Sequence, residues 1–210
     1  MKTLVLFAGL LIGTSATAQI DSGGVVPPVE GEPVQVQAGI YVVDIANINE
    51  VNNTFHVEMD MIATWNDPRL AFDRVEAGSD RRVLLGTESA KFLERLWSPN
   101  MVPENAIGPY NMIRLKTTIF SDGKITLEAR LAITLSAILD YRRFPFDKQI
   151  LPIRIGSFAW NIDQMVLSEL PGQTAIKPDF TLPEWSIGNI EVIHTEVSKP
   201  RADVPYSRLT

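Results

Sequence analysis

The sequence contains no cysteine and only two histidines, and both shortages limit what the protein can do. Without cysteine no disulfide can form, so the folded state must depend on its hydrophobic core. His56 and His194 lie far apart in strand-like segments, which argues against a histidine-based metal site or catalytic triad. Signatures of a nucleophile elbow, a phosphate-binding loop or a dinucleotide site are also missing. We therefore expect a protein that is not an enzyme and needs no metal or cofactor.

Long apolar runs are scarce as well. The longest, residues 4–12, is too short to span a bilayer. It follows Lys2 and precedes Ala16-Thr17-Ala18, an order typical of a secretory signal peptide with an Ala-x-Ala cleavage site. We therefore expect residues 1–18 to be a signal peptide and the chain to be exported. No other stretch approaches the length of a membrane span, so we expect none in this sequence.

Positive charge is in the minority. Nineteen Lys and Arg against 25 Asp and Glu give a net charge of −6. Loss of residues 1–18 removes one lysine and no acid, which changes −6 to −7. Nucleic-acid binding requires clustered Lys and Arg, so we do not expect a nucleic-acid partner. With 210 residues, of which 45% are hydrophobic, the chain can build one substantial core.

What the sequence contains in abundance is alternation of apolar and polar residues, the pattern of half-buried strands. Residues 19–33 are rich in Gly and Pro and predict an extended lead-in, so the folded domain is expected at residues 34–210. One short amphipathic helix is predicted near residues 88–96, capped by Thr87 or Ser89, after a solvated loop at 73–86. The whole pattern predicts an all-β, immunoglobulin-like β-sandwich of about ten strands. Strands are expected around residues 34–42, 57–63, 111–120, 125–136, 151–155, 184–192 and from 206 onward.

The most informative stretch, residues 137–151, joins two of these strands. At its centre lies the sequence Phe144-Pro145-Phe146-Asp147. Pro145 fixes its own φ and pushes Phe144 toward an extended conformation, so the chain turns in a defined way. A solvated loop does not need two exposed phenylalanines. They either pack beneath the loop or are presented to a partner surface.

This stretch resembles the signature loop of pentameric ligand-gated ion channels, the family of the nicotinic, glycine and GABA receptors and their bacterial homologues. In the animal members two cysteines bracket the loop, and the matching positions here are Ala137 and Leu151. The disulfide is therefore absent, as in the prokaryotic members. The resemblance implies the extracellular ligand-binding domain of a prokaryotic channel of this family.

Two tryptophan motifs extend the resemblance. Trp65 and Asp67, in Trp-Asn-Asp-Pro-Arg-Leu, resemble the Trp-x-Asp-x-Arg-Leu segment of the family. Trp97 and Pro99 resemble its Trp-x-Pro-Asp motif, with Asn100 in place of the aspartate. The resemblance implies a structural role for these motifs, and Trp65 is equally well a core aromatic followed by a turn.

The resemblance implies a ligand site between neighbouring subunits, where the family holds amines in a box of aromatic side chains. Carried over by position, the ligand-binding residues of this chain are Phe158, Tyr206, Asp60 and Glu104. Two aromatics and two acids make a small ligand with an amine or other cationic group reasonable. On general grounds Phe158 could instead be packed in the core, and the two acids could be solvated charges.

The resemblance also implies that the signature loop faces a membrane domain and transmits ligand binding to a pore. The residues assigned to this coupling are Arg143, Phe144, Pro145, Phe146 and Asp147. Asp147 could equally cap the loop backbone. In the first hypothesis a membrane domain follows residue 210, and the chain is the periplasmic or extracellular sensor of a homopentameric channel. The alternatives are a free-standing exported binding protein of the same fold, or a structural β-sandwich without a ligand.

Overall fold

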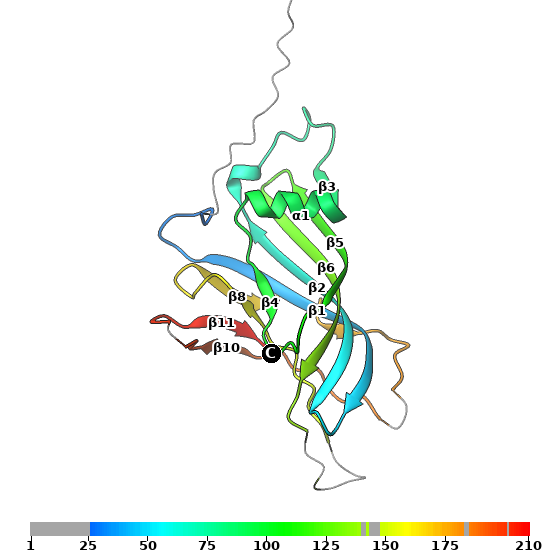
Figure 1. Cartoon of the computed structure of the whole chain (residues 1–210). Helices are drawn as coiled ribbons and strands as arrows, with labels where there is room; N and C mark the ends of the chain where they lie inside the picture. The colour runs from blue at the N-terminus through cyan, green and yellow to red at the C-terminus, as the bar shows by residue number, and fades with distance from the viewer. Residues whose placement is uncertain (1–25, 140–141, 143–147, 183–184, 201) are drawn as a thin grey trace, which may run out of the picture.

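The computed structural model describes residues 26–139, 142, 148–182, 185–200 and 202–210. The predicted signal peptide and the predicted coupling residues Arg143, Phe144, Pro145, Phe146 and Asp147 lie outside the described residues. The described part contains eleven strands, one α-helix and one 3-10 helix (Figure 1). The element order confirms an all-β chain with one short helix.

Seven strands form the larger sheet, in the order β3-β5-β6-β2-β1-β8 with β9 beside β1. The central strands are antiparallel neighbours, and β8 and β9 run parallel to β1. The bounds are β1 (Val34–Asn49), β2 (Thr54–Asn66), β3 (Arg81–Leu85), β5 (Asn111–Phe120), β6 (Lys124–Ser136), β8 (Met165–Glu169) and β9 (Ala175–Ile176).

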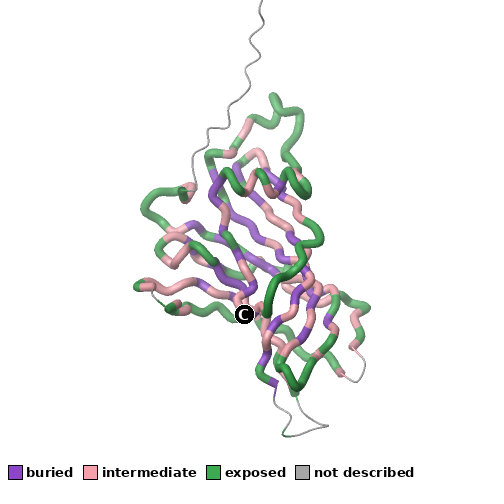
Figure 2. Tube along the Cα trace, viewed as in Figure 1, coloured by how far each residue is buried: buried purple, intermediate pink, exposed green. Residues whose placement is uncertain are grey.

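Four shorter strands form the second sheet, in the order β10-β11-β7-β4. Their bounds are β4 (Met101–Pro103), β7 (Ile155–Ser157), β10 (His194–Val197) and β11 (Tyr206–Leu209). In Figure 1 the β10–β11 hairpin extends to one side of the large sheet. The two sheets form the β-sandwich that the sequence predicts, with its core between them (Figure 2).

Alternation along β6 illustrates why these residues form strands. Every second side chain from Ala129 to Leu135 is buried, while the residues between them are half-exposed. A strand points successive side chains to opposite faces, so this pattern places one face in the core. The tight turn from β5 into β6 contains Gly123 at a φ of +85°, as the predicted Asp-Gly turn requires.

Three tryptophans pack together inside the sandwich. Trp65 and Trp97 are 3% and 1% exposed, and their rings meet edge to face with centroids 6.2 Å apart. Trp97 also packs against Trp160 at 5.7 Å. Trp65 is thus a core residue, in line with the structural role predicted for it. The Trp97–Trp160 contact connects the core to the loop that follows β7.

Asp67 organises the turn after β2. Its carboxylate is fully buried, accepts the Arg69 N–H at 3.1 Å and thereby caps the 3-10 helix η1 (Pro68–Leu70). The Arg69 guanidinium bonds both carboxylate oxygens at 2.8 Å, and this hydrogen bonding raises the pKa of Arg69. Asp67 therefore stabilises the turn after β2, which is a structural role.

Four expectations about individual elements are wrong. The strand expected around residues 151–155 does not form at 151–154, and β7 begins only at Ile155. Helix α1 (Gly86–Arg95) begins before Thr87, and its N-cap residue is Leu85, which has no side-chain acceptor to cap it. Ser89 lies inside the helix, where it is buried and bonds the Thr117 hydroxyl at 2.6 Å. The predicted loop at 73–86 contains strand β3. The described residues 185–192 form no strand. Backbone hydrogen bonding to the second sheet begins only at Ile193, which pairs with Thr210. Alternation indicates a strand-like sequence but does not supply a strand to pair with.

Candidate functional site

The outer face of the four-stranded sheet carries two side chains of β11. Ser207 and Leu209 are buried in the core, so period-two alternation turns Tyr206 and Arg208 to the opposite face. The neighbouring strand β7 pairs Gly156 with Arg208. Because Gly156 has no side chain, space remains beside Arg208 for another residue.

Glu104 occupies that space. It follows β4, and its N–H donates to the Arg154 carbonyl at 2.7 Å. A methyl group added at Gly156 would come within 2.6 Å of Glu104 Oε1, so the carboxylate lies directly over β7. Arg208 Nε donates to Glu104 Oε2, and only 12% of the Glu104 side chain is exposed. Glu104 is thus a largely buried, ion-paired carboxylate and not a solvated charge.

A second cation reaches the same carboxylate from the tip of the β10–β11 hairpin. Lys199 Nζ lies 3.5 Å from Glu104 Oε1, donates to the Ser157 carbonyl at 2.5 Å and sits 3.8 Å from the centroid of the Tyr206 ring. Carboxylates, carbonyls and aromatic faces are the groups that bind organic cations. We call this group the outer cluster: Glu104, Ser157, Lys199, Tyr206 and Arg208.

Phe158 lies next to the outer cluster and is 71% exposed. Its N–H donates to the Asn100 carbonyl at 3.0 Å, and the preceding Ser157 hydroxyl donates to the Pro99 carbonyl at 2.9 Å. The Trp160 N–H donates back to the Ser157 hydroxyl at 2.9 Å. These bonds fix the loop backbone while the Phe158 side chain remains at the surface. Phe158 is therefore not packed in the core.

Asp60 is not brought to the outer cluster. It lies on β2 in the larger sheet, paired in register with Arg130 on β6. The Arg130 guanidinium bonds both Asp60 oxygens at 2.7 Å and lies 3.6 Å from Glu58. The hydrogen bond to Asp60 is the main cause of a raised pKa for Arg130, which keeps it charged. Within one chain Lys199 contacts both Glu104 and Tyr206, Phe158 directly follows Ser157 of the cluster in the sequence, and Asp60 lies on the other sheet.

Sequence reasoning missed Lys199, Ser157 and Arg208. Arg208 could have been found, because it shares the outer face of β11 with Tyr206 two positions earlier. Lys199 had no such signal, since a lysine in a hairpin tip is usually a solvated charge. Ser157 contributes its backbone carbonyl, which no side-chain pattern can indicate.

Exposed aliphatic residues gather near the end of the molecule opposite α1. Val51, in the β1–β2 turn, is 90% exposed, and Ile138 is 91% exposed. The segment leading to Ile138 is bonded to that turn, because the Ala137 N–H donates to the Asn53 carbonyl at 2.9 Å. Figure 1 shows the β1–β2 turn far from α1. Exposed apolar side chains that lie together on one surface are typical of a region covered by another part of a protein.

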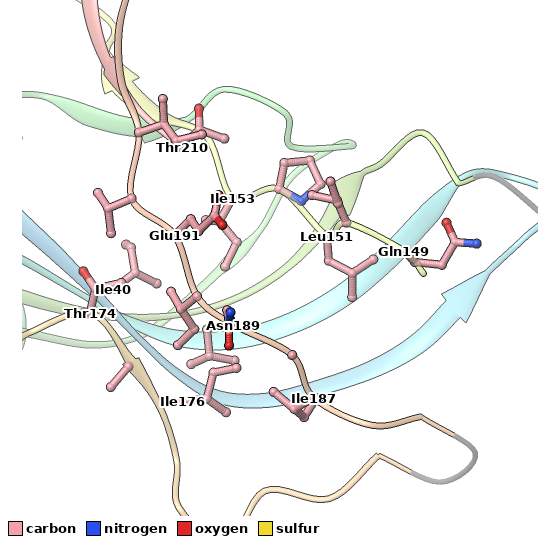
Figure 3. Close-up of a pocket in the computed structure, with 18 of the residues that line it drawn as sticks. Ile40, Gln149, Leu151, Ile153, Thr174, Ile176, Ile187, Asn189, Glu191 and Thr210 are labelled. Atoms are coloured by element: carbon pink, nitrogen blue, oxygen red, sulfur yellow. The ribbon is translucent and has the colours of Figure 1, made fainter. Parts of the chain in front are cut away.

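A cavity of about 1480 Å³ opens on the other side of the four-stranded sheet, between β1 and residues 185–193. Figure 3 shows its aliphatic lining, which includes Ile40, Ile153, Ile176 and Ile187. It lies against the core-facing side of β7 and β11, and it contains none of the predicted ligand-binding residues. The cavity and the outer cluster are therefore separate sites. The cavity lining also includes the acids Glu50 and Glu191, whereas in the cluster Glu104, Ser157 and Tyr206 surround one cation, the Lys199 ammonium.

Two negative findings concern the described residues. No group of three or more His, Cys, Asp or Glu side chains among them could hold a metal ion. None of the helices in the described part of the chain is long and apolar enough to cross a membrane.

The close approach of Glu104 to Gly156 makes a testable prediction. Gly156→Ala should displace the Glu104 carboxylate from Arg208 and Lys199, because the new methyl group would overlap it. The carboxylate is the end of a flexible side chain, so we expect the free energy of unfolding to change by no more than about 1 kcal/mol. The Arg208 Nε–H signal in NMR spectra should nevertheless shift strongly.

Gly188→Ala is the matched control, since a methyl group there would meet no atom within 4 Å. It should leave both the Arg208 signal and the unfolding transition unchanged. An unshifted Arg208 signal in Gly156→Ala would contradict the placement of the carboxylate over β7.

Comparison with known proteins finds one matching family and several relatives. The family described as "Neurotransmitter-gated ion-channel ligand binding domain" matches residues 24–207. The chain is 25% identical over 197 residues to "Gamma-aminobutyric acid receptor subunit beta" of Lymnaea stagnalis, covering 88% of this chain and 38% of that protein. It is 28% identical over 174 residues to "Proton-gated ion channel" of Gloeobacter violaceus, covering 83% of this chain and 45% of that protein. It is 27% identical over 177 residues to "Glycine receptor subunit beta" of Rattus norvegicus, covering 82% of this chain and 35% of that protein. The chain thus spans less than half the length of each of these relatives.

Proposed function

Because the chain belongs to the family of neurotransmitter-gated ion-channel ligand-binding domains, we propose that it is the sensing domain of a channel whose ligand carries a small ammonium group. In this proposal the domain lies on the periplasmic or extracellular face of the cell membrane. Five copies assemble into a ring, and ligand binding at the interfaces opens a pore formed by another part of the same protein. The relatives named above are channel subunits in which the matched region is less than half of the protein.

The observation that carries this proposal is the coordination of a cation in the outer cluster. Tyr206 supplies an aromatic face, Ser157 a carbonyl oxygen and Glu104 a carboxylate around one ammonium position. A cation over an aromatic face gains about 0.5 to 2 kcal/mol, and charge-assisted hydrogen bonds add to it. A primary or substituted ammonium is therefore the ligand class that this surface fits best.

Phe158 and Asp60 fit a site completed by a second copy. The Phe158 side chain stands at the surface beside the cluster, and exposed aromatics are frequent anchors at protein interfaces. Asp60 lies on the other sheet, so in the proposed ring the Asp60 face of one copy would meet the Phe158 face of the next.

The exposed aliphatic residues support the proposed coupling route. Val51 and Ile138 belong to two segments joined by the Ala137–Asn53 backbone bond. We propose that this end of the domain contacts the pore-forming part, together with the signature loop that follows Ile138. A movement at the Asp60 face of the larger sheet would reach that end through β2 and β6, because the two segments adjoin these strands.

The test uses the protein encoded by the complete gene, reconstituted in proteoliposomes and assayed for ion flux with a set of small primary ammonium ions. Phe158→Ala and Asp60→Ala should each raise the half-maximal concentration about tenfold or more, the equivalent of 1.4 kcal/mol. Glu104→Gln should have a larger effect, because it leaves Lys199 and Arg208 without their counter-charge.

Val75→Ala is the matched control, since Val75 is 83% exposed in the loop before β3, on a segment that contributes nothing to the outer cluster. Its concentration dependence should equal that of the unmodified protein. Equal half-maximal concentrations in the unmodified protein, Phe158→Ala and Asp60→Ala would refute the site.

A further inference from the structure

The ammonium position of the outer cluster is already filled by the chain's own Lys199. Its side chain extends from the hairpin tip to β7, where it reaches Ser157, 42 residues earlier in the sequence. Only 28% of the Lys199 side chain is exposed. A lysine usually keeps its ammonium in water, and ordering its long side chain costs conformational entropy. The contacts with Glu104, Ser157 and Tyr206 offset these costs.

The charge balance of the cluster excludes a second ammonium beside Lys199. Glu104 contributes −1, while Lys199 and Arg208 contribute +1 each, so the cluster carries +1. Another ammonium would place three cations around one largely buried carboxylate, and it would compete for the same carbonyl and the same ring face. Like charges at such distances repel strongly in a partly desolvated site. An external ammonium must therefore replace Lys199 and cannot join it.

We propose that Lys199 is a tethered occupant of the ligand position, and that an external ammonium binds by displacing it. This inference rests on the proposed function, because it concerns the same site and the same ligand class. A tethered group competes at a high effective concentration, on the order of millimolar for short connections. The unmodified chain should accordingly bind small ammonium ions weakly, and removal of Lys199 should strengthen that binding.

Lys199→Ala provides a direct test, because the deleted atoms beyond Cβ correspond to propylammonium. The experiment titrates propylammonium chloride into the whole chain at constant ionic strength and measures binding by calorimetry. We expect Lys199→Ala to bind it at least about tenfold more tightly than the unmodified chain. Propan-1-ol, which has the same length without the charge, should not bind. Lys199→Gln, which keeps a polar side chain one atom shorter and without the charge, should also bind propylammonium more tightly.

A second measurement follows the hairpin tip by amide hydrogen exchange. In the unmodified chain a saturating concentration of propylammonium should accelerate exchange at the amides of Ser198, Lys199 and residues 202–204, because the displaced lysine no longer holds the tip. Lys199→Ala should exchange rapidly there even without propylammonium. Lys124→Ala, which removes an exposed lysine at the start of β6, is the matched control and should resemble the unmodified chain in both measurements.

The outcomes separate this inference from the proposed function. If Lys199→Ala binds propylammonium no more tightly than the unmodified chain, the tethered-occupant proposal is overturned, even where ammonium ions open the channel. If binding tightens in Lys199→Ala but is lost again in Lys199→Ala combined with Glu104→Gln, the proposal stands. It would stand even if no ammonium ion produced flux in the complete protein, a result that would refute only the proposed function.

Discussion

Trp97→Ala should lower the free energy of unfolding by about 3 to 5 kcal/mol, the range for deleting a fully buried aromatic side chain. Trp97 is 1% exposed and packs between Trp65 and Trp160. Its removal leaves a cavity that neither neighbour can fill, because both rings are held by their own strands and loops. Equilibrium unfolding in urea, followed by fluorescence of the remaining tryptophans, measures the loss.

Trp97→Phe is the matched variant. It keeps an aromatic ring and removes the Trp97 indole N–H, which is buried and has no hydrogen-bond partner within the described part of the chain. An unpartnered buried donor costs about 1 to 3 kcal/mol, so its removal should offset part of the lost packing. We expect Trp97→Phe to cost less than half as much as Trp97→Ala. Equal losses in the two variants would contradict this account.

The same substitution should also affect the candidate site. Trp160 packs on Trp97, donates from its indole to the Ser98 carbonyl at 2.8 Å and from its backbone to Ser157. Loss of Trp97 should therefore loosen the loop that carries Phe158 and the Ser157 carbonyl. In Trp97→Ala we expect weaker binding of small ammonium ions than in Trp97→Phe, measured at a temperature where both variants are folded.

Gly123→Ala should destabilise the protein by about 3 to 4 kcal/mol, from backbone strain and steric overlap together. Gly123 has a φ of +85°, which an L-residue adopts only at a cost. A methyl group there would also come within 2.6 Å of the Asp67 carbonyl oxygen and 3.2 Å of the Pro68 Cα. These are backbone atoms of a turn held by the Asp67–Gly123 hydrogen bond at 2.9 Å, so they cannot move aside.

Gly172→Ala isolates the strain from the overlap. Gly172 has a φ of +70°, and a methyl group there would meet no atom within 4 Å. We expect it to lose only about 1 kcal/mol, the cost of the positive φ alone. Thermal unfolding of the two variants at the same pH gives the comparison. If Gly123→Ala and Gly172→Ala lower the free energy of unfolding equally, the overlap with the Asp67 carbonyl does not contribute to the loss of stability.

The two predictions concern different parts of the core, of which only the first adjoins the outer cluster. Trp97 lies under the loop that presents Ser157 and Phe158, and Gly123 joins the β2 motif to the hairpin that contains β6. The cluster itself lies on the outer face of the small sheet, where Arg208 and Lys199 are partly exposed around the largely buried Glu104 carboxylate. Variants in the cluster are therefore expected to change binding with little loss of stability, and variants in the core to change both.

The sequence by itself determined the all-β class, the strands with regular alternation and the turns that require Gly. Period-two patterns such as that of β6 depend only on side chains pointing to alternate faces, so they can be read without tertiary information. The motifs around Trp65, Trp97 and Phe144-Pro145-Phe146-Asp147 indicated the family, and the family match over residues 24–207 confirms it. The same reasoning wrongly predicted a strand at residues 185–192, because a strand also needs a pairing partner at the right distance.

Only the tertiary structure decided how the candidate site is built. Glu104 and Arg208 are 104 residues apart, yet they meet because β4, β7 and β11 are neighbours and Gly156 leaves room between them. Lys199 joins them through a hairpin tip whose direction no local pattern specifies. Asp60, grouped with them by resemblance, lies on the opposite sheet and pairs with Arg130. Local residue patterns report which face of a strand is buried, whereas the meeting of charges from distant strands depends on sheet order and register.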